Sequence, residues 1–272
     1  KKIILLAGPT ASGKSKLAIQ LAKKLNGEII NADSMQIYKE FSVLSSRPHK
    51  KEIKKVKHHL YGVISVKKYF SAGDWLKRAK KKIHQCHQNT KIPIIVGGTG
   101  LYFNTITKGI SKIPNIDIKT RNKVRNLFKR LGYKNFYEKL SNIDPKVKNR
   151  ILPSDSQRAQ RAYEVILKTK KSLFDWTANT KSDFINFEIK KIFIDIPREE
   201  LLKKISERTE LMFKNNCIEE VKKFNLLKLN KSLSSNKLIG VQEINAYLNG
   251  SITLDQCKEL TNIKTRQYAK RQ

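Results

Sequence analysis

The residues with the clearest chemical potential form the segment 8–15, which directly follows an apolar stretch at 3–7. Its sequence matches the phosphate-loop pattern G-x-x-x-x-G-K-[ST]. In such a loop, backbone N–H groups and the N-terminus of the next helix surround a di- or triphosphate. Lys14 would neutralise phosphate charge, and the Ser15 hydroxyl is suited to ligate Mg²⁺. We therefore predict a diphosphate site made by Gly8, Pro9, Thr10, Ala11, Ser12, Gly13, Lys14 and Ser15.

A second candidate is Asp33, which follows the apolar run 28–31. At the carboxyl end of a parallel strand, its carboxylate would face the phosphate loop along the same sheet edge. There it could ligate Mg²⁺ through water, or accept a proton from a nucleophile beside the diphosphate. An aspartate after a strand is often only a helix N-cap. The neighbouring phosphate loop favours the chemical role.

Several cationic residues could contact phosphate groups. Arg158 and Arg161 are three residues apart on a predicted helix and share one face, where they could bind phosphates or form a solvated basic surface. Arg208 is either a surface residue or a phosphate clamp. The segment 265–272 combines three cations with Tyr268, a pattern that can hold a single-stranded RNA loop.

The composition indicates a polyanionic partner. Lys and Arg number 57 against 23 acidic residues, which gives a net charge of +34. Such a field attracts polyanions, although the lysine-rich composition of an AT-rich genome accounts for part of the excess. The three cysteines are odd in number and widely spaced, which favours a reducing, cytoplasmic setting over a disulfide framework. No apolar run approaches the roughly 20 residues that span a bilayer, so no membrane association is expected. The histidine pairs 58–59 and 84/87 are expected to be structural.

The elements that must position these residues alternate along the chain. Short apolar runs separated by helical patterns predict a parallel sheet with helices on both faces. The expected strands are 3–7, 28–31, 60–64, 93–96 and 191–196, and the expected late helices are 198–214, 241–248 and 254–271. From about 111 to 187 only helices are expected, at 121–131, 135–140 and 156–168.

These patterns predict an α/β fold. Its core is a P-loop NTPase-like parallel sheet flanked by helices, and it carries an all-helical insertion domain. We expect the core at 1–110 and 187–272, with RNA-binding helices at its C-terminal end. The insertion is expected at 111–186.

Taken in order, the motifs resemble those of the tRNA dimethylallyltransferase family. The resemblance spans essentially the whole chain, but the segment 39–48 departs from the family pattern, with Leu44 where a glycine is usual. The matching pieces are GPTASGKS (8–15), DSMQIY (33–38), His-His-Leu (58–60), residues 69–75, IVGGTGLY (95–102), DSQRAQRAYEV (155–165), Arg208, IGVQE (239–243) and TRQYAKRQ (265–272).

The resemblance implies transfer of a dimethylallyl group from dimethylallyl diphosphate to N6 of the adenosine immediately 3′ of the anticodon. Diphosphate is released, and Mg²⁺ is the implied cofactor. By the same resemblance Asp33 is the general base, Lys14 and Arg208 hold the diphosphate, and Thr99 lies at the reaction channel. The implied tRNA contacts are Asp33, Ser34, Met35, Gln36, Thr99, Arg121, Gln157, Arg158, Ala159, Gln160, Arg161, Lys237, Leu238, Ile239, Gly240, Val241, Gln242, Arg266 and Lys270. The expected partner is the anticodon stem-loop of tRNA, bound by a cytoplasmic monomer.

Two other functions fit part of the sequence. A small P-loop kinase would use the loop, Asp33 and a helical lid carrying Arg158 and Arg161, but it leaves the basic C-terminal helix unused. A non-catalytic RNA-binding protein would explain the charge but not the intact Lys14-Ser15 pair.

Overall fold

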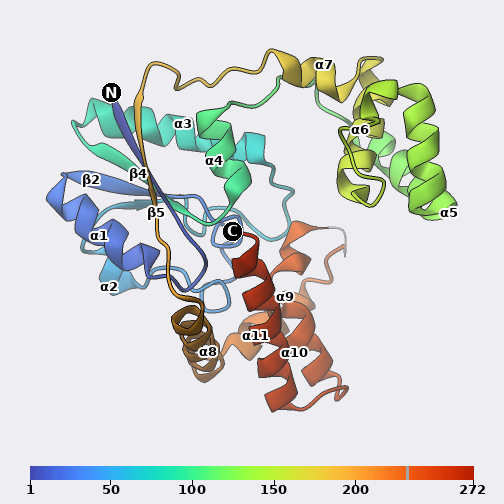
Figure 1. Cartoon of the computed structure of the whole chain (residues 1–272). Helices are drawn as coiled ribbons and strands as arrows, with labels where there is room; N and C mark the ends of the chain where they lie inside the picture. The colour runs from blue at the N-terminus through green and yellow to red at the C-terminus, as the bar shows by residue number, and fades with distance from the viewer. Residues whose placement is uncertain (231–232) are drawn as a thin grey trace. The chain divides into compact units, whose positions relative to one another are not determined.

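The computed structural model describes residues 1–230 and 233–272 (Figure 1). These residues form two compact units. The first comprises Lys1–Ile106 with Asn186–Gln272, and the second comprises Thr107–Ile185. The candidate site lies in the first unit, which contains the phosphate loop, Asp33, Thr99 and Arg208.

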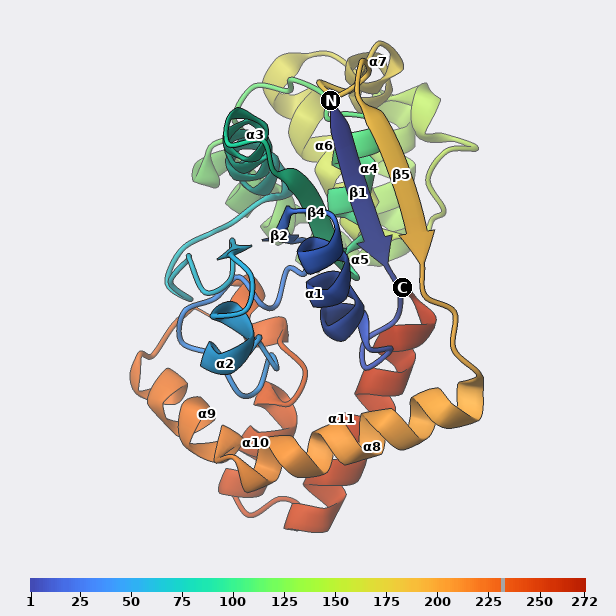
Figure 2. The ribbon, with the colours of Figure 1, turned by 90° about the vertical axis from the view of Figure 1, so that its left-hand side faces the viewer.

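A parallel five-stranded sheet forms the centre of the first unit, in the order β3-β2-β4-β1-β5. Because every pairing is parallel, the carboxyl ends of the strands share one edge, where α/β folds bind ligands. Figure 2 shows β1 and β5 side by side with their arrowheads at this edge. The strands are β1 (Lys2–Ala7), β2 (Gly27–Asn31), β3 (His58–His59), β4 (Ile92–Gly97) and β5 (Glu188–Phe193). The expected strands at 3–7, 28–31 and 93–96 are confirmed.

The bounds expected for the two edge strands were wrong. The third strand ends at His59, because Leu60 takes a left-handed φ of 63°. Residues 63–64 instead donate to the carbonyl of Ile37. The last strand spans 188–193 rather than 191–196, since it runs in register with β1 from Lys2 opposite Glu188 to Ala7 opposite Phe193. The limits of β5 are therefore set by its pairing with β1 and not by the position of the most apolar stretch.

The helices of the first unit include one that the sequence analysis missed. Helix α9 carries apolar residues at 217, 221 and 224, a helical spacing that could have revealed it. The helices at 198–214, 241–248 and 254–271 are confirmed to within a residue. The bounds are α1 (Lys14–Lys24), α2 (Lys50–Ile53), α3 (Ala72–Gln88), α4 (Gly100–Thr107), α8 (Arg198–Lys214), α9 (Cys217–Leu226), α10 (Val241–Leu248) and α11 (Leu254–Lys270).

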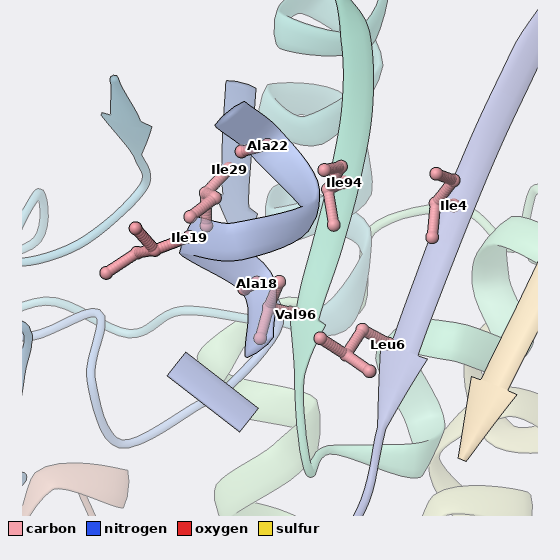
Figure 3. Packing of buried hydrophobic residues seen from close by; sticks show 8 residues of the cluster. All are labelled: Ile4, Leu6, Ala18, Ile19, Ala22, Ile29, Ile94 and Val96. Carbon is pink, nitrogen blue, oxygen red and sulfur yellow. The ribbon is translucent and has the colours of Figure 1, made fainter. Parts of the chain in front are cut away.

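Helix α1 covers one face of the sheet. Its residues Ala18, Ile19 and Ala22 pack against alternate residues of the central strands (Figure 3). Alternation is expected because successive strand residues point to opposite faces. The strand residues in this cluster are Ile4, Leu6, Ile29, Ile94 and Val96. This packing fixes the start of α1, and with it the phosphate loop, against the ends of β1 and β4.

Helix α3 covers the opposite face, where polar groups are buried and paired. The Trp75 indole donates to the carbonyl of Asn31 at 2.8 Å and stacks on Tyr102 with ring centroids 4.4 Å apart. Glu28 lies 2.6 Å from Nε2 of His59 and accepts a hydrogen bond from the Cys86 thiol at 3.6 Å. Because each of these groups has a partner, we interpret the cluster as part of the core.

The second unit is helical. Residues 107–185, all of which the structure describes, form helices around Phe136 and Tyr163 and contain no strand. Gly132, with φ 69° and ψ 175°, breaks α5 into the two helices expected from the sequence. The elements are α5 (Ile118–Ile143), a short 3₁₀ turn (Pro145–Val147), α6 (Ser156–Thr169) and α7 (Leu173–Ala178). Across the described ranges of the chain, no helix has the length and apolar character needed to cross a membrane.

Candidate active site

The phosphate loop joins β1 to α1 at the carboxyl edge of the sheet. Gly13 caps the N-terminus of α1 with a φ of 86° and carries no side chain that could obstruct a ligand. Ala11 takes a φ of 63°, a conformation that is strained for a residue other than glycine. Such strain is concentrated at sites where the backbone must present its N–H groups to a ligand.

Lys14 is held inside this loop. Its ammonium donates to the carbonyls of Gly8 at 2.8 Å and Pro9 at 2.5 Å. Burial lowers the pKa of Lys14 to about 8, and the nearby Arg208 adds to that shift, whereas the carboxylate of Asp33 opposes it. Burial disfavours the charged form of this ammonium, and a bound anion would favour it. An anionic ligand would therefore raise the pKa of Lys14 and stabilise its positive charge.

A cavity of about 520 Å³ opens over the loop. Its walls include Lys14, Ser15 and the hydroxyl-bearing Ser12, whose Oγ is buried and has no hydrogen-bond partner among the described residues. A buried hydroxyl without a partner is costly unless a ligand accepts its hydrogen bond. The donors around this cavity therefore suit an anion of diphosphate size.

Asp33 lies on the rim of the same cavity, and its neighbours fix its position. Its backbone N–H donates to Oδ1 of the fully buried Asn31 at 2.8 Å. Asn31 in turn donates to the carbonyls of Asp33 at 3.0 Å and Leu60 at 3.1 Å. The Asp33 carboxylate accepts from the N–H of Met35 at 2.9 Å, an Asx turn that leaves its second oxygen available.

Thr99 connects the end of β4 to this turn. Its Oγ1 accepts from the N–H of Ser34 at 2.9 Å, and its own N–H donates to the carbonyl of Ala32 at 3.2 Å. The two chains approach closely here, since a Cβ on Gly97 would lie 2.2 Å from the Ala32 carbonyl. Because Gly97 has no Cβ, the end of β4 can approach Ala32 this closely, and Thr99 is thereby brought near Asp33.

Arg208 reaches the loop from α8. Its guanidinium donates to Oγ1 of Thr10 at 2.8 Å and to the carbonyl of Ser45 at 3.3 Å. Burial lowers the pKa of Arg208, and the Asp33 carboxylate opposes the shift. Arginine remains charged even so, which places a second buried cation beside Lys14.

The C-terminal helix ends on the same loop. Gln272, which follows α11, accepts the N–H of Thr10 at 2.6 Å. Its amide nitrogen fills the space beside Gly98, where a Cβ would lie 1.8 Å away. Tyr268 lies next to Thr99 and Gln272, and burial raises its pKa well above the usual range. Figure 2 shows α11 crossing α8 and ending beside β1.

A second, smaller cavity of about 50 Å³ adjoins the first. Both cavities are lined by Thr10, Asp33 and Arg208. The larger one is walled by the phosphate loop, whereas the smaller one combines polar lining residues with five apolar side chains. These are Met35, Leu44, Met212, Leu238 and Ile239. An anion site and an apolar pocket therefore meet at three polar residues.

Comparison with known proteins decides the family. Residues 36–272 match the sequence model of the IPP transferase family. The chain belongs to the IPP transferase family. It is 54% identical, over its full length and 87% of the relative, to the tRNA dimethylallyltransferase of Pelagibacter ubique strain HTCC1062. It is 42% identical, over its full length and 75% of the relative, to the tRNA dimethylallyltransferase of Rickettsia massiliae strain Mtu5.

Solved structures agree with this membership. The full-length tRNA isopentenylpyrophosphate transferase of Bacillus halodurans is 30% identical, with a TM-score of 0.69 over all of this chain and 85% of that one. A eukaryotic dimethylallyltransferase acting on tRNA is 28% identical, with a TM-score of 0.85 over all of this chain and 68% of that one. The P-loop-like α/β fold is thus shared across the family.

In this IPP transferase, the residues expected to contact tRNA within the first unit differ in exposure. Ser34, Met35, Gln36 and Thr99 surround Asp33 and are partly exposed. Gln36 also donates to the carbonyls of Ser45 and Ser46. Near α10, Lys237 and Gln242 are exposed and Ile239 is partly exposed, whereas Leu238, Gly240 and Val241 are buried. On α11, Lys270 is exposed and Arg266 pairs with Glu259 at 3.4 Å.

The remaining expected tRNA contacts of the IPP transferase lie in the second unit, on α5 and α6. Gln157 and Arg158 are exposed on α6, and Gln160 and Arg161 are partly exposed. Arg158 pairs with Asp155, the N-cap residue of α6, at 3.3 Å, and Arg161 pairs with Glu164 at 3.4 Å. Ala159 faces the helical core and offers no side-chain surface. Arg121 donates to the carbonyl of Ile116 at 3.1 Å.

Four residues of the IPP transferase site were missed by sequence reasoning. Asn31 and Gln272 stood inside quoted or neighbouring segments but had no role assigned. Ser45 offers only its backbone carbonyl, so its residue type carries no signal. Glu220 lies on the unpredicted α9 and binds the 42–44 loop.

Proposed function

We propose that this IPP transferase moves a dimethylallyl group from dimethylallyl diphosphate to N6 of the adenosine immediately 3′ of the anticodon in tRNA. The observation that carries the proposal is the junction at Thr10, Asp33 and Arg208. There the anion cavity meets an apolar pocket beside a carboxylate. A prenyl diphosphate has this same division, with an anionic head, an apolar tail and the reacting carbon between them. The names of its relatives agree with this reaction.

The leaving diphosphate is stabilised by donors already in place. As the bond between C1 and oxygen breaks, the electron pair stays on the diphosphate and the allyl group becomes cationic. Lys14, Arg208 and the loop amides surround the developing charge. One preorganised donor of this kind contributes about 3 kcal/mol to a transition state. The Ser12 hydroxyl, which has no partner within residues 1–230 and 233–272, supplies a further donor.

Asp33 acts on the acceptor. The N6 amine of adenine is a weak nucleophile, because its lone pair is delocalised into the ring. As the bond between N6 and C1 forms, the amine must lose a proton, and the carboxylate of Asp33 takes it. The hydrogen bonds that Asn31 and Met35 donate to Asp33 hold its loop while this happens.

The loop also fits Mg²⁺. Ser15 lines the anion cavity and presents a hydroxyl, a hard oxygen donor suited to this ion alongside diphosphate oxygens. When bound, Mg²⁺ supplies positive charge that offsets the charge of the diphosphate. The cations of Lys14 and Arg208 would offset the same charge.

The tRNA partner is proposed from charge and access. The net charge of +34 favours a polyanion, and adenine can reach the partly exposed carboxylate of Asp33 only when it leaves its stacked loop. An anticodon loop presents unpaired bases, so the cost of extrusion is small. We further propose a cytoplasmic monomer, in keeping with the three cysteines, Cys86, Cys217 and Cys257, which are all buried and free.

Family membership and the apolar pocket argue against the two other functions. A kinase would leave the apolar side chains of Met35, Met212 and Ile239 at the smaller cavity without a role. A relic loop would not keep Lys14 buried and bonded to the carbonyls of Gly8 and Pro9, beside a Ser12 hydroxyl without a partner in the described part of the chain.

One assay tests the three functions together. The protein is incubated with unmodified tRNA, Mg²⁺, and either dimethylallyl diphosphate labelled in its prenyl group or ATP labelled in its γ-phosphate. We expect prenyl label in the tRNA and no transfer of the phosphate label. Digestion to nucleosides should place the label on the adenosine 3′ of the anticodon. Phosphate transfer, or tRNA binding without any transfer, would overturn the proposal.

A further inference from the structure

We propose that Leu44 limits the length of the prenyl group that the enzyme accepts. This inference rests on the proposed function, and it concerns the apolar pocket rather than the anion cavity. It assigns a branched five-carbon donor to that pocket and names the side chain that closes it.

The pocket is narrow, and apolar side chains form part of its wall. Its volume is about 50 Å³, and Met35, Leu44, Met212 and Ile239 provide apolar walls. It opens onto Thr10 and Arg208, which also line the anion cavity, so the tail of a donor bound by its diphosphate would enter here.

Leu44 is positioned to close this pocket. Its side chain is 4% exposed, and it packs against Gly240, where a Cβ would lie 2.7 Å from Cδ1 of Leu44. Gly240 takes a left-handed φ of 98°, so a larger residue there would be strained as well as crowded. The leucine therefore occupies the space that a smaller residue at position 44 would leave to the ligand.

The backbone around Leu44 is firmly held. Glu220 of α9 accepts hydrogen bonds from the N–H groups of Ser42 and Val43, both at 2.8 Å, and of Leu44 at 2.9 Å. It also accepts from the Ser42 hydroxyl at 2.6 Å. On the other side, the carbonyl of Ser45 accepts from Arg208. Because one carboxylate holds three successive N–H groups, the loop cannot easily withdraw to admit a longer tail.

The consequence is a limit on length. A ten-carbon donor has the same diphosphate and reacting carbon, but five further carbons must pass the side chain of Leu44. Protein interiors are close-packed, so this overlap is not absorbed without displacement. Replacing leucine by alanine removes three carbon atoms at that point and lengthens the pocket.

The test compares donors of two lengths. For wild type, Leu44→Val and Leu44→Ala, kcat/KM is measured with dimethylallyl and geranyl diphosphate and a saturating anticodon stem-loop. We expect the ratio of ten-carbon to five-carbon kcat/KM to rise at least about tenfold in Leu44→Ala, with a smaller rise in Leu44→Val. The control is Leu226→Ala, which removes an exposed leucine of α9 and should leave the ratio unchanged. Thermal unfolding of each variant checks its fold, and Leu44→Val carries the test if the alanine variant does not fold.

Distinct outcomes separate this inference from the proposed function. If wild type uses both donors equally well, or if the ratio is the same in all variants, Leu44 does not set the length while the prenyl transfer stands. If the variants instead raise the KM for RNA and leave the donor ratio unchanged, the pocket holds the base and the inference is wrong. If wild type transfers no five-carbon group, the proposed function falls, and the inference with it.

Discussion

The guanidinium of Arg208 donates a 2.8 Å hydrogen bond to the hydroxyl of Thr10, although 198 residues separate them in the sequence. Thr10 also donates its N–H to Gln272 at 2.6 Å. One residue of the phosphate loop is therefore bonded both to α8 and to the end of α11. A movement of α8 or of the end of α11 would therefore displace the phosphate loop that holds the donor.

Arg208→Lys should impair donor use while keeping a positive charge. A lysine cannot donate to both Thr10 and Ser45 from a planar fork. We expect kcat/KM for the donor to fall about 100-fold, within the range typical of one lost donor. Steady-state kinetics with saturating RNA measures this effect. Arg198→Lys, at an exposed position of the same helix, is the control. If the two variants had the same kcat/KM for the donor, Arg208 would have no role in binding the diphosphate.

Donor use should depend on the protonation of Lys14. Its pKa is lowered to about 8 by burial, so the ammonium is lost as the pH rises through that value. Since the charged form binds the diphosphate, kcat/KM for the donor should fall about tenfold per pH unit above pH 8. Lys14→Arg stays charged throughout and should give a lower but flat profile between pH 7 and 9. A wild-type profile that is flat over this range would contradict the prediction.

Asp33→Asn should slow catalysis without weakening RNA binding. The amide oxygen can still accept from the N–H of Met35, so the turn is kept, but the amide cannot take the proton of N6. We expect kcat to fall by about 10²-fold or more. Filter binding of the stem-loop should be unchanged, and Asp255→Asn, at an exposed position of α11, serves as control. A parallel loss of RNA affinity and kcat would argue against a base.

Gly98→Ala should displace the side chain of Gln272. The new Cβ would lie 1.8 Å from its amide nitrogen, which would break the contact with Thr10. Because Gln272 is flexible, we expect a modest loss of stability, about 1 kcal/mol. A double-mutant cycle with Gln272→Ala, followed by urea unfolding, should show that the two effects are not additive. Strict additivity would mean that the two residues do not interact.

Gly97→Ala should be much more damaging than Gly100→Ala. At Gly97 a Cβ would meet the Ala32 carbonyl at 2.2 Å, and backbone atoms cannot move aside as a side chain can. We expect the free energy of unfolding to fall by about 3 kcal/mol. At Gly100 nothing lies within 4 Å, so alanine should be neutral or slightly stabilising. Urea unfolding measures both, and similar values would contradict the close approach of β2 and β4.

Local patterns were enough to predict much of the fold. The strands at 3–7, 28–31 and 93–96, and the helices at 198–214, 241–248 and 254–271, carry their periodicity within a few residues. The predicted bounds of the two edge strands were wrong. The limits of β5 depend on its register with β1, and β3 ends where Leu60 takes a left-handed φ. Neither property is visible in the apolar runs from which the strands were predicted.

The sequence by itself determined the phosphate loop, since the spacing of its glycines, Lys14 and Ser15 specifies both a backbone path and a chemistry within eight residues. Only the tertiary structure decided which distant side chains complete the site. Arg208, Gln272 and the Leu44 wall come from separate elements, and their meeting depends on how those elements pack. The physical reason is the separation along the chain over which each interaction acts. Neighbouring residues fix turns and helices, whereas contacts between residues 160 or more positions apart follow from strand register and helix packing.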